Sequence, residues 1–182
     1  MNKNFEITIL RLHWIKDDGQ DDPEDKCVHG EVLVRIGDEV LSNAEAGSWS
    51  LGTFALFLMR SLKRDYEPGM YENSLLPCCG HFIIPSERSG DLLIVQGCNM
   101  GLEWKITHTK RGINLQSETG KPILVNKDEF QEEIRNMIVT IEEFYANAKP
   151  KTYYDDFEAE GWSQFWAEWE ALKEMNGIRM NL

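Results

Sequence analysis

The chain has 182 residues, a length typical of one domain and sufficient to bury a large core without disulfides or metal ions. Hydrophobic residues make up 42% and charged residues 27%, which excludes a mainly disordered protein. The formal charge is −12, from 31 Asp and Glu against 19 Lys and Arg. We therefore expect neither a nucleic-acid partner nor binding to an anionic membrane, because both require a basic surface.

The beginning of the chain and its cysteine content predict a cytoplasmic protein. Residues 1–10 read MNKNFEITIL, with one early lysine and no apolar stretch followed by small residues, so no secretory signal is expected. The longest apolar run, Phe54–Met59, is far shorter than the about 20 residues of a membrane-spanning helix. Four cysteines in a chain that does not need disulfides favour reduced thiols in the cytosol.

The first third of the chain predicts a strand, a hairpin and a helix. Residues 5–14 alternate with the period of a strand and are rich in β-branched and aromatic side chains. The acidic segment 17–25 that follows is interpreted as a solvated loop rather than a calcium site. Residues 29–42 predict a hairpin around Gly37 and Asp38. Residues 48–63 carry apolar side chains three and four apart, which predicts an amphipathic helix.

The rest of the chain predicts short strands followed by two helices. Turn residues separate five short apolar runs, which are typical of antiparallel strands: 81–84, 92–96, 102–108, 113–116 and 123–125. A helix is predicted over 126–147, where Asn126 is the N-cap and Glu129 completes a capping box. A last helix is predicted over 155–176, with Asn176-Gly177 as its C-cap.

This order of elements predicts the fold class. Strands, one helix, many strands and two helices indicate an α+β protein: an antiparallel β-sheet meander with three main helices packed mainly on one face. We expect a single domain over residues 1–182, with a C-terminal aromatic-rich helical segment at 153–177.

Two short Cys/His segments raise the alternative of a zinc site. Cys27 and His29 lie at the entrance of one predicted strand, and Cys79 and His81 at the entrance of another. Thiolate and imidazole are ligands of tetrahedral Zn²⁺, so these four residues would form a site if the segments lay side by side. The Cys-x-x-Cys knuckles of a zinc ribbon are absent, however. Buried thiols and half-buried histidines are the favoured interpretation, and no cofactor is expected.

Cysteine catalysis is a second chemical alternative. Cys98 lies in a turn between two predicted strands, where His81 or His108 would act as its base. The neighbouring pair Cys78-Cys79 is not a Cys-x-x-Cys redox motif. A glycine-rich phosphate loop and a Gly-x-Ser-x-Gly motif are also absent from the sequence. We therefore expect no catalytic residues.

The most unusual segment is aromatic and acidic. Seven aromatic side chains lie within the seventeen residues 153–169, and those singled out as candidates for protein binding are Tyr153, Tyr154, Trp162, Trp166 and Trp169. A helix that closes the core is the favoured interpretation, and a partner-binding face is the alternative, because Trp and Tyr are typical hot-spot residues. Residues 121–182 carry 13 Asp and Glu against 7 Lys and Arg, a charge that suits a basic protein such as a nuclease.

Several short motifs resemble those of a known class of bacterial proteins. They are His29-Gly30, residues 79–82 (CGHF), residues 97–104 (GCNMGLEW) leading to 105–108 (KITH), and residues 143–145 (EFY). Over roughly residues 27–147 the chain resembles uncharacterised proteins similar to the immunity proteins of polymorphic-toxin and contact-dependent inhibition systems. The resemblance implies an acidic cytosolic α+β protein that binds and neutralises a toxin without catalysis.

Two functions from other classes remain open at this point. One is a Cys/His-dependent enzyme, with or without zinc. The other is a regulatory or structural subunit whose Trp-rich C-terminal helix docks on a larger partner or on a second copy of the chain, as a homodimer. The first alternative requires converging thiols and imidazoles, and the second requires exposed aromatic side chains.

Overall fold

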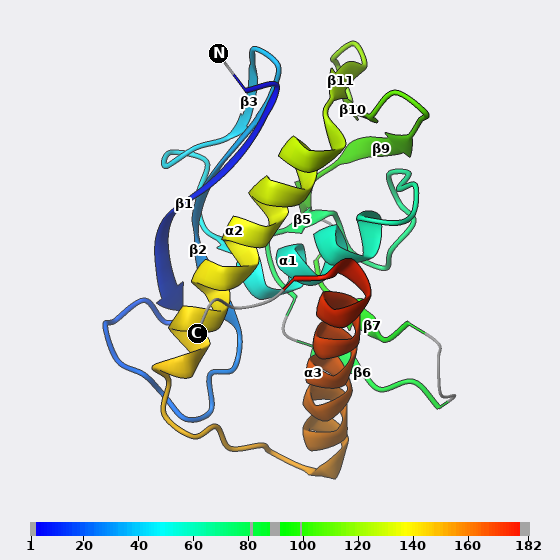
Figure 1. Cartoon of the computed structure of the whole chain (residues 1–182). Coiled ribbons are helices and arrows are strands. Elements are labelled where there is room, and N and C mark those ends of the chain that lie inside the picture. Colours follow the sequence, from blue (N-terminus) through cyan, green and yellow to red (C-terminus); the bar gives the residue numbers. More distant parts are fainter. Residues whose placement is uncertain (1–2, 81, 88–91, 99, 179–182) are drawn as a thin grey trace.

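The computed structural model describes residues 3–80, 82–87, 92–98 and 100–178 (Figure 1). It confirms the α+β class, with three helices and several small antiparallel sheets. The helices are α1 (Leu51–Ser61), α2 (Lys127–Ala146) and α3 (Asp156–Asn176). The strands are β1 (Phe5–Trp14), β2 (Val28–Ile36), β3 (Glu39–Ser42), β4 (Trp49–Ser50), β5 (Leu76–Pro77), β6 (Phe82–Ile84), β7 (Ile94–Gln96), β8 (Gly101–Leu102), β9 (Trp104–His108), β10 (Ile113–Ser117) and β11 (Ile123–Val125).

Within the described residues the strand pairs are all antiparallel, as predicted, and they are divided among four sheets. The sheet nearest the N-terminus has the order β1-β2-β3, with β4 also paired to β2. The predicted hairpin turn lies between β2 and β3, where Gly37 has φ of 59°, a conformation that favours glycine. A second sheet has the order β11-β10-β9, and the pairs β5-β8 and β6-β7 are separate two-stranded sheets.

Helix α1 lies at the centre of the molecule. All eleven of its residues are buried, as the wide apolar stripe predicted. Ser50 is its N-cap, but the Ser50 hydroxyl bonds to the Thr53 hydroxyl at 3.2 Å rather than to a backbone N–H of the first turn. In Figure 1, α2 passes beside β1 and β2, whereas α3 lies in front of β6 and β7. The buried apolar side chains of these elements form one cluster.

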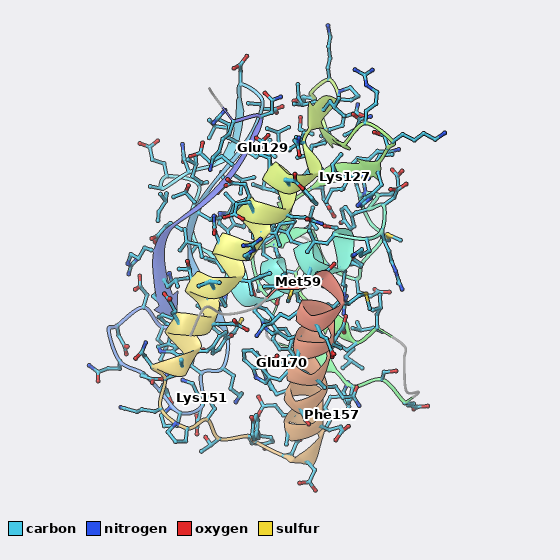
Figure 2. The ribbon with its side chains drawn as sticks, viewed as in Figure 1. Met59, Lys127, Glu129, Lys151, Phe157 and Glu170 are labelled. Atoms are coloured by element: carbon cyan, nitrogen blue, oxygen red, sulfur yellow. The ribbon has the colours of Figure 1, made fainter. Side chains whose placement is uncertain are left out.

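Helix α2 begins one residue after its predicted start, but the predicted capping box does not form. Asn126 caps the helix through the backbone N–H of Asp128 at 2.8 Å. Glu129 instead accepts hydrogen bonds from the backbone N–H groups of Asn4 at 2.8 Å and Phe5 at 3.2 Å, and Figure 2 shows it at the start of α2 beside β1. Glu133, which is buried, accepts from Ile7 N–H at 3.0 Å. These carboxylates satisfy backbone donors of Asn4 and of β1, which is the edge strand of its sheet in the described residues.

Helix α3 agrees with its predicted ends. The Asp155 side chain accepts from Glu158 N–H at 2.8 Å, and Gly177 ends the helix with φ of 64°. Gly161 lies on the side of α3 that faces β6, where an added Cβ would be 2.7 Å from the Ile83 carbonyl oxygen. The absence of a side chain at this position allows the helix and strand to approach closely. None of the described helices is long and apolar enough to cross a membrane.

This close approach leads to a testable prediction for Gly161→Ala. At a solvent-exposed position inside a helix, replacing Gly by Ala would stabilise the protein by about 1 kcal/mol, because Ala is the better helix former. Here we expect a lower melting temperature, since the new methyl group would force α3 away from the Ile83 backbone. Ser163→Ala, at an exposed position of the same helix, is the control and should leave the melting temperature almost unchanged. A Gly161→Ala variant as stable as Ser163→Ala would show that α3 and β6 are farther apart.

Candidate functional site

A large hollow lies between α3 and the end of α1. Its volume is about 810 Å³, within the usual range of binding sites. We call it the α3 groove. One wall is formed by α3, the opposite wall by the end of α1 and the residues after it, and the remaining side by segments 86–87 and 92–93. The lining residues used below are Met59, Arg60, Lys63, Arg64, Leu92, Leu93, Glu160, Ala167, Glu168, Ala171 and Met175.

The α3 wall combines small apolar residues with carboxylates. Nine residues of α3 are exposed: Asp156, Phe157, Glu160, Ser163, Ala167, Glu170, Ala171, Glu174 and Met175. They recur three or four positions apart and so form one outward stripe. Figure 2 shows Phe157 near the N-terminal end of α3 and Glu170 farther along it, with Met59 of α1 beside the other end. The stripe has four carboxylates and no lysine or arginine.

A buried ion pair forms the base of the groove. Arg60 Nε donates to Glu168 Oε1 at 2.7 Å, and Arg60 Nη2 donates to Glu168 Oε2 at 2.9 Å. The Arg60 side chain is only 4% exposed and that of Glu168 only 15%. Arg60 Nη2 also donates to the Leu93 carbonyl oxygen at 2.9 Å, and Leu93 N–H donates to Glu168 at 3.4 Å. The pair therefore joins α1, α3 and the segment leading into β7.

A smaller hollow lies on the other side of Leu92 and Leu93. It has a volume of about 250 Å³ and shares these two residues and Arg60 with the α3 groove. Tyr71 lines it, and burial raises the pKa of the Tyr71 phenol. The guanidinium of Arg60 is 5.3 Å from the ring centroid of Tyr71. Three exposed apolar side chains surround this hollow: Met70, Leu92 and Ile94. The segment 92–94 thus presents an apolar surface beside both hollows.

No family model matches this chain. No match was found among curated proteins or solved structures either. The resemblance to immunity proteins therefore stays a prediction, and the functional argument depends on the geometry of this molecule.

The aromatic residues proposed from the sequence for protein binding have two different environments. Trp162 and Trp169 are buried, and Trp166 is partly buried, with its ring centroid 4.8 Å from that of Tyr145. Burial in the core explains the tryptophan stripe, so Trp162 and Trp169 are not available as surface anchors. Tyr153 and Tyr154 are exposed, Tyr154 to 94%, and precede α3. The groove lies beside the opposite, outward stripe of α3.

The two segments that were considered as an alternative zinc site lie side by side. Cys27 Sγ is 3.8 Å from the Gly80 carbonyl oxygen, next to Cys79. The Cys27 thiol is buried, lies 3.2 Å from the Ser50 hydroxyl, and has its pKa raised to about 12 by burial. His29 Nδ1 is 3.1 Å from the Cys27 carbonyl oxygen. His81 is outside the described residues, and the described ones contain no group of three or more His, Cys, Asp or Glu arranged to hold a metal ion.

His108, one of the two bases considered for Cys98, has other partners. Its Nδ1 lies 3.1 Å from Asp65 Oδ1, and its Nε2 lies 3.2 Å from the Leu62 carbonyl oxygen. Both ring nitrogens are therefore engaged. The other base considered, His81, is outside the described residues. The neighbours of Cys98 are instead two further cysteines, Cys78 and Cys79.

The groove was not predictable from the sequence, because its α3 wall consists largely of small residues that have no special chemistry. Ala167 and Ala171 carry no chemical signal in a sequence. Arg60 was the available indication, because a cation directly after the apolar run 54–59 interrupts the apolar face of a predicted central helix. A buried arginine needs a carboxylate partner, and Glu168 of α3, 108 positions away along the chain, supplies it.

Proposed function

We propose that this chain is a non-catalytic, cytosolic protein-binding module that antagonises a basic partner protein, as immunity proteins antagonise toxins. The observation that carries the proposal is the outward stripe of α3, which has four carboxylates and no lysine or arginine and which contributes Glu160, Ala167, Ala171 and Met175 to the lining of a hollow of about 810 Å³. The chain has 31 acidic against 19 basic residues, so part of its negative charge has no counterpart within the chain. A basic partner supplies that counterpart.

The shape and charge of the groove favour an amphipathic basic segment as its occupant. Ala167 and Ala171 are exposed and small, so a partner backbone can approach α3 closely between Glu160 and Glu174. Lysines or arginines of the partner would pair with these carboxylates, and apolar side chains would contact Met175 and its apolar neighbours in the groove. Lys63 and Arg64 on the opposite wall would repel a partner bound in the reverse orientation.

The same charges argue against self-association through this surface. In a symmetric dimer the α3 stripes would face one another, and like charges would be brought together. A basic protein avoids this repulsion and is attracted over a distance of about 8–10 Å at physiological salt. We therefore expect fast, salt-sensitive association with a heterologous partner.

The experiment uses the proteins encoded immediately next to this chain, as the immunity resemblance suggests. Each is co-expressed with the chain, and complex formation is measured by light scattering and calorimetry. We expect one basic neighbour to arrest growth alone, to be neutralised by this chain and to form a stoichiometric complex. Ala171→Arg should weaken the complex by about a hundredfold, because it places a cation in the α3 groove.

The matched control is Ser163→Arg. It makes the same change of charge on the exposed stripe of α3, but Ser163 does not line the groove. We expect its affinity to stay within about threefold of the wild type, since an exposed rim charge changes affinity little. Equal losses for both variants would indicate that net charge alone drives binding. Binding that neither variant affects would contradict the proposed surface.

A further inference from the structure

Three thiols gather at the open end of the β6-β7 hairpin. Cys78 and Cys79 lie just before β6, and Cys98 lies just after β7. The register pairs Phe82 with Gln96, which brings the two ends of the hairpin together. All three cysteines are partly exposed. Cys27, by contrast, is buried. The hairpin therefore ends in a cluster of accessible sulfur atoms.

Cys98 is in direct contact with Cys79. The backbone N–H of Cys98 donates to Cys79 Sγ at 2.9 Å, and the Cys98 thiol donates to the Met100 carbonyl oxygen at 3.7 Å. The Cys79 segment is held in place, because Asn73 donates to the Cys79 carbonyl oxygen at 2.8 Å. The hydrogen bond from Cys79 is the main cause that lowers the pKa of Cys98, whereas burial raises the pKa of Cys79. Of the three, Cys98 is thus the most readily deprotonated.

We propose that Cys98 and Cys79 are a redox pair in which Cys98 reacts first with a hydroperoxide and Cys79 then closes a reversible disulfide. Cys98 thiolate attacks one oxygen of the peroxide, the O–O bond breaks, and the leaving oxygen takes a proton. The product is a Cys98 sulfenic acid. Cys79 then attacks the Cys98 sulfur, and the S–O bond breaks to release water. With hydrogen peroxide, two thiols become one disulfide and two waters form.

Geometry favours a disulfide between Cys98 and Cys79 over one between Cys78 and Cys79. A disulfide between the adjacent residues Cys78 and Cys79 would join Cα atoms about 3.8 Å apart, which is shorter than disulfides normally span. Cys79 Sγ already accepts the Cys98 N–H. The new bond would tie together the ends of the hairpin that carries Ile94 and borders the α3 groove. The redox step does not depend on the proposed binding function.

The experiment treats the native full-length protein with hydrogen peroxide, blocks the remaining thiols with an alkylating reagent and maps the peptides by mass spectrometry. We expect a linked pair of peptides containing Cys79 and Cys98, which a dithiol reductant separates. Before oxidation, Cys98 should be alkylated about tenfold faster than Cys78, because its thiolate fraction is larger. Cys27 should remain reduced and unreactive until the protein is unfolded.

Two variants separate the roles of the cysteines. Cys78→Ser should still form the linked pair at a similar rate. Cys79→Ser should stop at a Cys98 sulfenic acid, detected with a dimedone reagent, or oxidise further. A linked pair formed by Cys78, a disulfide between two chains, or a thiol cluster that stays reduced because it holds a metal ion would overturn the proposal. Equal alkylation rates for Cys98 and Cys78 would also overturn it.

Discussion

Arg60→Met is expected to destabilise the protein by about 3–5 kcal/mol, the usual cost of removing one partner of a buried ion pair. Glu168 would remain largely buried without its cation, and the Leu93 carbonyl oxygen would lose its donor. The variant would also lose the contacts of the guanidinium with Phe57 and Tyr71, each 5.3 Å from the ring centroid. Urea unfolding followed by tryptophan fluorescence measures the change.

Two further variants test this explanation. Adding Glu168→Gln to Arg60→Met removes the unpaired charge, so the double variant should be more stable than Arg60→Met alone. Arg135→Met is the matched control, because Arg135 pairs with Glu132 at 3.4 Å on the exposed surface of α2. Its effect should be below about 1 kcal/mol. If Arg60→Met proved no more harmful than Arg135→Met, Arg60 and Glu168 would not form a buried pair.

Trp169→Ala is expected to cost about 3–5 kcal/mol of stability, as is typical for truncation of a buried large aromatic residue. Trp169 is 0% exposed and packs against Phe165 and Trp166, with centroid distances of 5.8 and 5.6 Å. Its indole N–H also donates to Glu142 at 2.8 Å, a bond that alanine cannot make. Thermal and urea unfolding followed by circular dichroism measure the loss.

Phe157→Ala is the control for Trp169→Ala. Phe157 is an aromatic residue of the same helix but is 48% exposed, so its truncation should cost less than about 1 kcal/mol. A Trp169→Ala variant with normal stability but no partner binding would contradict the burial described here. It would instead support the docking function that the tryptophan stripe suggested in the sequence.

The three helices were predictable because their signals are local. The apolar period of α2 and its cap Asn126 lie within the helix itself, and the observed helix differs from the prediction by one residue at each end. Asp155 and Gly177 likewise mark the ends of α3. Each of these features depends on residues no more than four positions apart. Local periodicity also explains why the short strands were found close to their observed positions.

The parts that the sequence did not reveal depend on contacts between distant segments. Glu129 has the spacing of a capping box, yet its carboxylate accepts the N–H groups of Asn4 and Phe5, more than a hundred residues away along the chain. The division of the strands into four sheets depends in the same way on which edges meet. Local spacing cannot distinguish a side chain that caps its own helix from one that reaches a neighbouring strand.

The candidate site also depends on contacts between distant segments, which local sequence patterns do not reveal. The tryptophans of α3 are the strongest signal in its sequence, but aromatic residues at helical spacing serve equally well in a core, and burial decides between the two roles. The groove depends on the small side chains of Ala167 and Ala171. They form a wall of it only because the end of α1 and Leu92 lie on its other sides. The sequence suggested histidine partners for Cys79 and Cys98, whereas the hairpin register brings Cys98 to Cys79.

Hydrogen–deuterium exchange of the chain, alone and bound to its neighbour-encoded partner, tests the central claim most directly. Binding in the α3 groove predicts slower amide exchange in residues 160–175 and 92–95, with little change in β1, β2 and β3. Slower exchange confined to β1, β2 and β3 or to the acidic loop 17–25, with α3 unchanged, would contradict the account and place the binding surface elsewhere.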